Sequence, residues 1–176
     1  SVFLLEISSS GVLSYYFSIS NSSYGVQGDA LVANRWYHIA VTRNGDVHTL
    51  YVNGHSVGTR TQSGSLDDRA QPFSIGRQGD YTSDTFDGYI QDFRFYKGVA
   101  KYTENFIPAA TDPDIVPDTP SGVSLSSNLA EITNGSVNFD GTGDYLQIPN
   151  HADLRFGSGA FCVEAFVYYS ETSGNG

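Results

Sequence analysis

Two Asn-Gly dipeptides, Asn44-Gly45 and Asn53-Gly54, constrain the fold more than any other feature of the sequence. Both lie within residues 36–59, between runs rich in Val, Ile, Tyr and Thr. Asn-Gly tolerates positive φ at both central positions of a type I′ turn, so each pair predicts a two-residue β-hairpin. The segment is therefore predicted to be a three-stranded antiparallel meander.

The two predicted turns agree on which side chains share a face, because side chains alternate along a strand. The first turn is expected to place Arg43 opposite Asp46, and the second to place Val52 opposite His55 and Leu50 opposite Val57. The predicted core face is apolar and holds Tyr37, Ile39, Val41, Leu50, Val52 and Val57, with His48 near its hairpin end. The predicted opposite face is more polar and holds His38, Ala40, Thr42, Thr49, Tyr51 and Ser56.

Strand-like runs follow one another along most of the remaining chain, separated by short segments rich in turn-forming residues. The predicted strands are 2–7, 12–19, 72–76, 88–96, 135–139, 145–149 and 160–169. The last is apolar on both sides, which is typical of a central strand in a layered sheet. Residues 20–34 and 76–87 are expected to be loops. No segment has helical periodicity over three turns. The fold class is therefore predicted to be all-β, an antiparallel two-sheet sandwich.

Composition narrows the possible partners. The chain of 176 residues has a formal net charge of −10, which disfavours nucleic acid and anionic membranes as partners. No apolar run approaches the roughly 20 residues of a membrane-spanning helix. Cys162 is the one cysteine and lies in an apolar run, so we expect an inert core thiol.

Three segments of the sequence resemble laminin-G-like, concanavalin A-like jelly rolls. WYHIAVTRNGDVHTLYVNGHSVG, residues 36–58, is similar to the family's W-H-H-V-A-V-T-R and L-Y-V-D-G pieces. FDGYIQDFRFYKGVAKYTENFIP, residues 86–108, is similar to the last strand and tail found in phage and other viral structural proteins. SVNFDGTGDYLQIPNHADLRFGSGAFCVEAFVYY, residues 136–169, is similar to the beginning of the family's domain.

The order of these pieces differs from that of the family, because the opening piece comes last here. Residues 1–106 thus resemble the C-terminal half of a jelly roll, and residues 135–176 the N-terminal half. Residues 107–134 include most of the six prolines and are expected to be a linker or an extended segment along the surface. Three explanations stay open: a circularly permuted domain, one register of a tandem array, or strand exchange with a neighbouring copy.

A catalytic site is not predicted. Sandwich glycosidases place two carboxylates about 5–9 Å apart across the scissile bond. Glu164 stands alone on its strand, with Cys162 and Phe166 as its i±2 neighbours. The histidines have no metal-ligand spacing and no serine lies in a G-x-S-x-G elbow. We therefore expect Glu164 to be a hydrogen-bonded structural residue and the protein not to be an enzyme.

Calcium is a cofactor that the resemblance makes plausible, since some relatives hold it at a loop rim. The candidate metal ligands are Asp80, Asp84 and Asp87, but none has EF-hand spacing, and solvated turn residues are the alternative. Asp140 and Asp144 are expected to shape a turn by bonding to nearby backbone amides.

Glycan or surface-polymer binding is the function that the resemblance and the loop composition favour. Aromatic rings that stack on sugars and polar side chains that bond to hydroxyls occur together in the two longest predicted loops. These candidate ligand-binding residues are Asn21, Tyr24, Asp29, Asp80 and Tyr81. Tyr51 and His38, on the polar face of the meander, form a second candidate platform.

These observations predict a non-catalytic recognition or adhesion module in an extracellular or virion-surface structure. The alternative is a purely structural unit that self-associates with identical copies, as a fibre or array formed by strand exchange.

Overall fold

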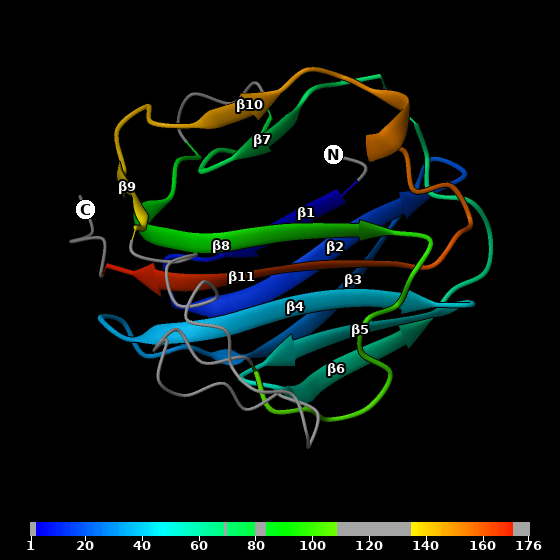
Figure 1. Cartoon of the computed structure of the whole chain (residues 1–176), viewed down its shortest axis with the longest axis horizontal. Coiled ribbons are helices and arrows are strands. Elements are labelled where there is room, and N and C mark those ends of the chain that lie inside the picture. The colour runs from blue at the N-terminus through cyan, green and yellow to red at the C-terminus, as the bar shows by residue number, and fades with distance from the viewer. Residues whose placement is uncertain (1–2, 69, 80–83, 109–134, 171–176) are drawn as a thin grey trace, which may run out of the picture.

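The computed structural model describes residues 3–68, 70–79, 84–108 and 135–170, which form three antiparallel sheets (Figure 1). A three-stranded sheet has the order β1-β2-β3, and a six-stranded sheet has the order β6-β5-β4-β11-β8-β9. β7 and β10 form a separate two-stranded sheet. The strands are β1 (Phe3–Ile7), β2 (Val12–Ile19), β3 (Ser22–Ala30), β4 (Trp36–Asn44), β5 (Val47–Val52), β6 (His55–Thr61), β7 (Phe73–Ile75), β8 (Asp87–Lys97), β9 (Val137–Asp140), β10 (Leu146–Ile148) and β11 (Phe161–Tyr169). One 3₁₀ turn, η1 (Ala152–Leu154), precedes β11.

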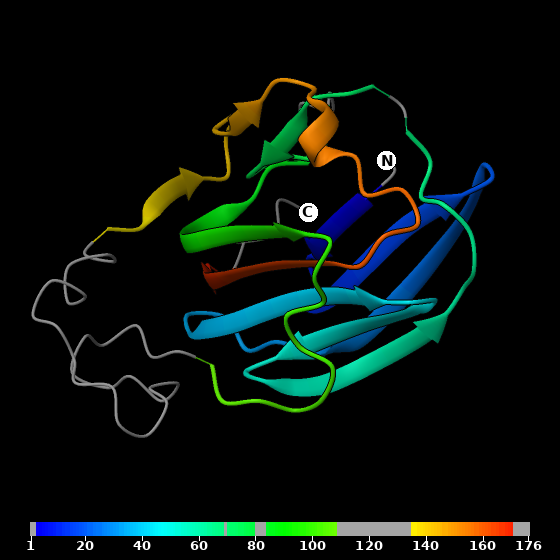
Figure 2. The same cartoon turned by 45° about the vertical axis from the view of Figure 1, so that its right-hand side comes forward.

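The three-stranded sheet packs against one face of the six-stranded sheet, and this arrangement confirms the predicted all-β sandwich (Figure 2). The residues between the sheets are apolar and aromatic, as the alternation along the strands predicts. The fully buried members include Leu13, Tyr15, Phe17, Ile39, Val41, Leu50, Phe161 and Val163. Within the described ranges, no helix is long and apolar enough to cross a membrane.

The meander of β4, β5 and β6 has the predicted faces, although its first turn differs by one position. Val52 lies opposite His55, and Asn53 and Gly54 both have positive φ, as predicted. In the first hairpin Asn44 pairs with Val47, so the central residues are Gly45 and Asp46, and the prediction that Arg43 faces Asp46 is wrong. Each residue of β4 therefore pairs with a residue of β5 two positions further along than predicted. Because side chains alternate with a period of two, this shift leaves every side chain on its predicted face.

A bulge in the second hairpin also departs from the predicted register. Leu50 pairs with Gly58 rather than with Val57, because the ladder shifts between Leu50 and Tyr51. Val57 nevertheless packs against the core as predicted. An extra residue on one strand of an antiparallel pair produces this kind of local shift.

β11 is the central strand that its two-sided apolarity predicts. It pairs with β4 along one edge and with β8 along the other. Phe161, Val163 and Val167 face the core between the sheets. Cys162 and Glu164 face the other side of the sheet and are buried there as well. These pairings join residues 161–169 to strands from the first 97 residues of the same chain.

Residues 22–30 form β3 and not a loop, so this part of the predicted loop 20–34 is wrong. β3 pairs with β2 from Ile19↔Ser22 to Val12↔Ala30. Val26 is its one fully buried residue, and Tyr24 packs against the core. The strand has a polar, glycine-containing sequence because most of its side chains are exposed at the edge of the sheet.

A buried arginine closes one end of the sandwich. The Arg43 side chain is fully buried and donates hydrogen bonds to three carbonyl oxygens, of Gly45 at 2.9 Å, Gly64 at 2.6 Å and Gly157 at 3.1 Å. It therefore joins the β4–β5 turn to two loops that are distant in sequence. Its five N–H donors make it suited to satisfying several carbonyls at once.

His48 is buried in the aromatic core, as its predicted position on the core face implies. Its ring stacks on Phe17 with centroids 3.8 Å apart, and its Nδ1 lies 3.1 Å from the Tyr15 hydroxyl. Burial, together with the nearby Arg43 guanidinium, lowers the pKa of His48 to about 4. The neutral imidazole is therefore the form that the fold accommodates.

The stability of the fold is expected to fall as the pH drops from about 6.5 to about 4. In this window the unfolded chain protonates His48 and the folded chain does not, so this contribution to the free energy of unfolding is complete above pH 6.5. As the pH falls below 6.5, the His48 contribution to the free energy of unfolding is lost at up to about 1.4 kcal/mol per pH unit. Urea unfolding of His48→Phe should show a flatter pH dependence, whereas exposed His55→Gln should behave as wild type. An unchanged slope in His48→Phe would contradict the assignment.

Candidate functional site

The face of the six-stranded sheet that points away from the three-stranded sheet, called here the outer face, has a covered part and an open part. Residues 98–108 cross it over β4, β5 and β11. The rings of Tyr102 and Phe106 stack on each other with centroids 3.4 Å apart and pack over Ala40, Tyr51 and Cys162. We call this segment the strap. The side chains of the outer face that lie under it are as buried as those of the core between the sheets.

Backbone hydrogen bonds fix the strap to the β5–β6 turn. The Phe106 N–H donates to the Gly54 carbonyl at 2.9 Å, and the Ser56 N–H donates to the Asn105 side chain at 2.9 Å. A Cβ on Gly54 would lie 1.8 Å from the Phe106 carbonyl oxygen, so the turn must carry glycine for a steric reason as well as for its φ of 78°. The strap is thus an ordered part of the domain.

Glu164 is the buried charge beneath the strap. Its carboxylate accepts hydrogen bonds from Tyr102 Oη at 2.6 Å and from Lys101 Nζ at 2.7 Å. Longer contacts of 3.3 Å come from His38 Nε2 and Tyr96 Oη. Burial alone would raise the pKa of Glu164, but the donors outweigh burial and lower the pKa to about 2.

The surroundings of Glu164 do not fit a catalytic acid. A general acid needs a raised pKa, and the nucleophile or base of a glycosidase needs a second carboxylate across the substrate. The nearest acidic side chain on the neighbouring strand, Asp92, is held by a bidentate ion pair with Arg94 at 2.6 and 2.8 Å. The predicted structural role of Glu164 is consistent with this geometry.

The open part of the outer face carries a row of three aromatic side chains across three neighbouring strands. Tyr168 on β11 lies opposite Trp36 on β4 and opposite Tyr89 on β8. The ring centroids are 5.6 Å apart for Trp36 and Tyr168 and 5.7 Å apart for Tyr89 and Tyr168. Trp36 is 43% exposed and Tyr89 36% exposed, so the two outer rings reach solvent. We call Trp36, Tyr168 and Tyr89 the aromatic row.

Two asparagines lie beside the aromatic row. Asn138 on β9 lies directly opposite Tyr89, so it projects from the same face. Asn34 precedes β4, and its side-chain oxygen accepts a hydrogen bond from Tyr168 Oη at 3.4 Å. The three rings are tilted by 56° and 72° to one another, so they form a ridged surface rather than a flat one. Rings with amide side chains beside them offer both stacking and hydrogen bonding to a ligand.

Of the ligand-binding residues predicted from the sequence, the structure describes Asn21, Tyr24 and Asp29, and these three do not form one cluster. Tyr24 stacks on Phe17 at 5.7 Å with the Arg60 guanidinium 4.9 Å above its ring, so one ring face is already occupied within the domain. Asn21 and Asp29 lie at opposite ends of β3 and are exposed. Asp80 and Tyr81 lie outside the described residues. Whether these residues bind a ligand stays a prediction.

The second predicted platform is wrong. His38 is 4% exposed and Tyr51 is 2% exposed, because the strap covers both. The calcium prediction stays untested, since Asp80 is outside the described ranges. Among the residues that the structure places, no group of three or more His, Cys, Asp or Glu side chains could hold a metal ion.

The prediction for the β9–β10 turn is confirmed. Asp140 accepts a hydrogen bond from the Thr142 N–H at 2.7 Å, and Asp144 accepts one from the Asp140 N–H at 3.3 Å. Both carboxylates therefore shape the turn. The aromatic row, by contrast, was not predicted, because its members come from three segments far apart in the chain. The only available signal was the presence of exposed aromatic residues at strand ends.

Comparison with known proteins identifies one family. The family model described as the concanavalin A-like lectin/glucanases superfamily matches residues 2–104. No curated protein matches the chain. No solved structure matches it either. The matched range includes β1 to β8 and the first part of the strap, and β11 lies outside it.

Replacing Glu164 with Gln is expected to destabilise the fold by about 3–5 kcal/mol, because it leaves Lys101 as a partly buried cation without its counter-charge. Urea denaturation should show the loss. Glu104→Gln makes the same chemical change at an exposed position of the strap and should have little effect. Equal stabilities for the two variants would show that the ion pair does not hold the strap.

Proposed function

The chain belongs to the concanavalin A-like lectin/glucanase superfamily, and from this we propose that it is a non-catalytic module that binds glycans on a cell or virion surface. A domain of this superfamily fits a binding or structural module, and laminin-G-like members are generally non-catalytic and typically extracellular. The observation that carries the glycan proposal is the aromatic row.

The aromatic row suits a sugar chain for geometric reasons. Pyranose rings present C–H groups on their faces, and these pack on aromatic side chains, while the hydroxyls around the edge require hydrogen-bond partners. The rings of the row are 5.6 and 5.7 Å apart, which is comparable with the length of one sugar unit. Asn34 contacts the central ring, Tyr168, and Asn138 lies beside Tyr89, so both amides are near enough to the row to bond to hydroxyls of a bound chain.

The acidity of the chain favours an uncharged glycan over an anionic one. The formal net charge of −10 repels sulfated and sialylated chains over the range of the Debye length, about 8 Å at physiological salt. The row itself contributes no charge. Neutral hexose polymers are therefore the ligand class with which this surface is compatible.

Trp36→Ala and Tyr89→Ala are each expected to weaken glycan binding by about tenfold or more, because each removes an exposed ring that a sugar would cover. A glycan array with and without EDTA would identify a ligand, and isothermal titration would give the affinities. Tyr16→Ala removes a tyrosine of similar exposure, 38%, from the other sheet and serves as the matched control.

The same array tests the residues predicted from the sequence. Loss of binding in Tyr24→Ala or Tyr81→Ala, with Trp36→Ala unaffected, would move the glycan site to the loops and overturn the aromatic row. Loss of binding in EDTA alone would point to calcium at Asp80, Asp84 and Asp87.

Self-association by strand exchange is a second candidate function. The observation that favours it is the position of β11, a C-terminal segment that fills the middle of a sheet whose other long strands precede residue 98. Such a strand, if it came from a second copy, would link chains into dimers or fibres.

Size-exclusion chromatography with light scattering over a range of concentrations is expected to separate the two arrangements. If β11 fills its own sheet, as it does in this structure, the chain elutes as a monomer at every concentration. Oligomers that persist on dilution and dissociate only with unfolding would support strand exchange, because exchange requires β11 to leave the sheet.

A further inference from the structure

The sandwich is closed along one side and open along the other. On the closed side β3 and β6 approach so closely that a Cβ on Gly28 would lie 2.9 Å from a Val57 methyl group. On the open side β1 is hydrogen-bonded to β2, and β7 to β10, and the described residues form no ladder between β1 and β7. Figure 1 shows β7 and β10 above β1 at this side of the molecule.

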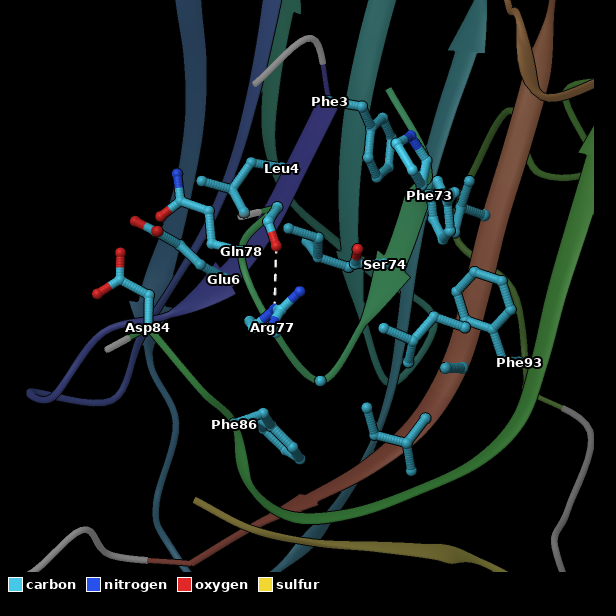
Figure 3. A pocket seen from close by; sticks show the side chains of 18 of the residues that line it. Phe3, Leu4, Glu6, Phe73, Ser74, Arg77, Gln78, Asp84, Phe86 and Phe93 are labelled. Atoms are coloured by element: carbon cyan, nitrogen blue, oxygen red, sulfur yellow. Dashed lines mark hydrogen bonds between the residues drawn. The ribbon is translucent and has the colours of Figure 1, made fainter. Parts of the chain in front are cut away.

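A cavity of about 1240 Å³ lies at the open side and runs from the core between the sheets to the surface. Figure 3 shows it between β1, β7 and β8, with aromatic rings gathered at one end. Protein interiors seldom contain voids larger than a water molecule, so a space of this size is a site that a ligand can occupy. Its apolar lining includes Phe3, Leu5, Phe73, Phe86, Ile90, Phe93, Val163, Ala165 and Val167.

The rim of the cavity is acidic. Carboxylates at the lining are more numerous than cations, and the two cations are already engaged. Arg155 pairs with Asp68 at 3.1 Å, and the Arg77 guanidinium lies 3.6 Å from the centroid of the Tyr145 ring. The acidic lining residues nearest the surface are Glu6, Asp67, Asp68, Asp84 and Asp87. Such a rim disfavours a ligand with a carboxylate or sulfate head.

We infer that this cavity binds an uncharged, mainly apolar small molecule with a hydroxyl head, of the class of long-chain alcohols. The aromatic and aliphatic lining holds the apolar body. The rim carboxylates can accept a hydrogen bond from the hydroxyl head and repel anionic analogues. The site lies between the sheets and is separate from the aromatic row, so the inference does not depend on the proposed glycan function.

Nile red, a neutral dye whose fluorescence increases in apolar sites, tests the inference on the whole chain. We expect saturable binding of one dye per chain, displacement by hexadecan-1-ol, and displacement by hexadecanoate that is at least tenfold weaker. Equal displacement by the alcohol and the anion would overturn the ligand class. No saturable binding of the dye would overturn the site.

Ala165→Leu fills the cavity and decides whether the dye binds there. Ala165 lines the cavity, whereas Ala40 is fully buried under the strap and does not, so Ala40→Leu is the matched control. We expect Ala165→Leu to weaken dye binding at least tenfold without lowering the melting temperature, and Ala40→Leu to lower the melting temperature through overpacking.

An Ala165→Leu variant that is destabilised like Ala40→Leu and still binds the dye would overturn the site.

Discussion

The structure depends on β11 being enclosed on all four sides. Its two edges are hydrogen-bonded to β4 and β8, and its two faces are buried by the sandwich core and by the strap. A strand in this position cannot carry a solvated side chain, so its one charged residue, Glu164, must find its partners inside the protein. Lys101 and Tyr102 supply them from the strap. The segment that covers the outer face thus also provides the partners of the one carboxylate on the central strand.

The enclosure of β11 also divides the outer face. The strap reaches as far as His38, whose ring contacts Phe106, and no other described segment covers the end of the sheet beyond it. The aromatic row occupies this uncovered end, where Tyr168 is the last-but-one residue of β11. The strap therefore buries one group of aromatic side chains and leaves another available, although both lie on the same face of the same sheet.

The faces of the meander could be predicted from the sequence, but its exact register could not. Alternation along a strand is unaffected by a shift of two residues, so the core positions Ile39, Val41 and Leu50 were correct although the Asn44-Gly45 turn was placed one position too early. β3 was missed because exposed edge strands need few apolar residues, and Val26 is its one fully buried residue. The pattern of apolar residues along a strand indicates which of its faces is buried. An exposed edge strand has few buried residues, so this pattern is weak.

The candidate site lay beyond what the sequence could predict, because it depends on the order of strands in a sheet. Trp36, Tyr89 and Tyr168 become neighbours only because β11 lies between β4 and β8. The same limit explains the error at His38 and Tyr51, which are buried by a strap about 50 residues further along from Tyr51 and more than 60 from His38. The spacing of residues along the chain predicts neither the aromatic row nor the covering of His38 and Tyr51.

Cys162 gives the enclosure of β11 a chemical consequence. Its thiol is fully buried, and burial, together with the nearby Glu164 carboxylate, raises its pKa to about 12. Almost no thiolate exists at neutral pH, and thiolate is the form that reacts with oxidants, metal ions and disulfides. Since this is the one cysteine of the sequence, no disulfide can form within the chain. The fold therefore has no internal cross-link that a change from an oxidising to a reducing environment would break.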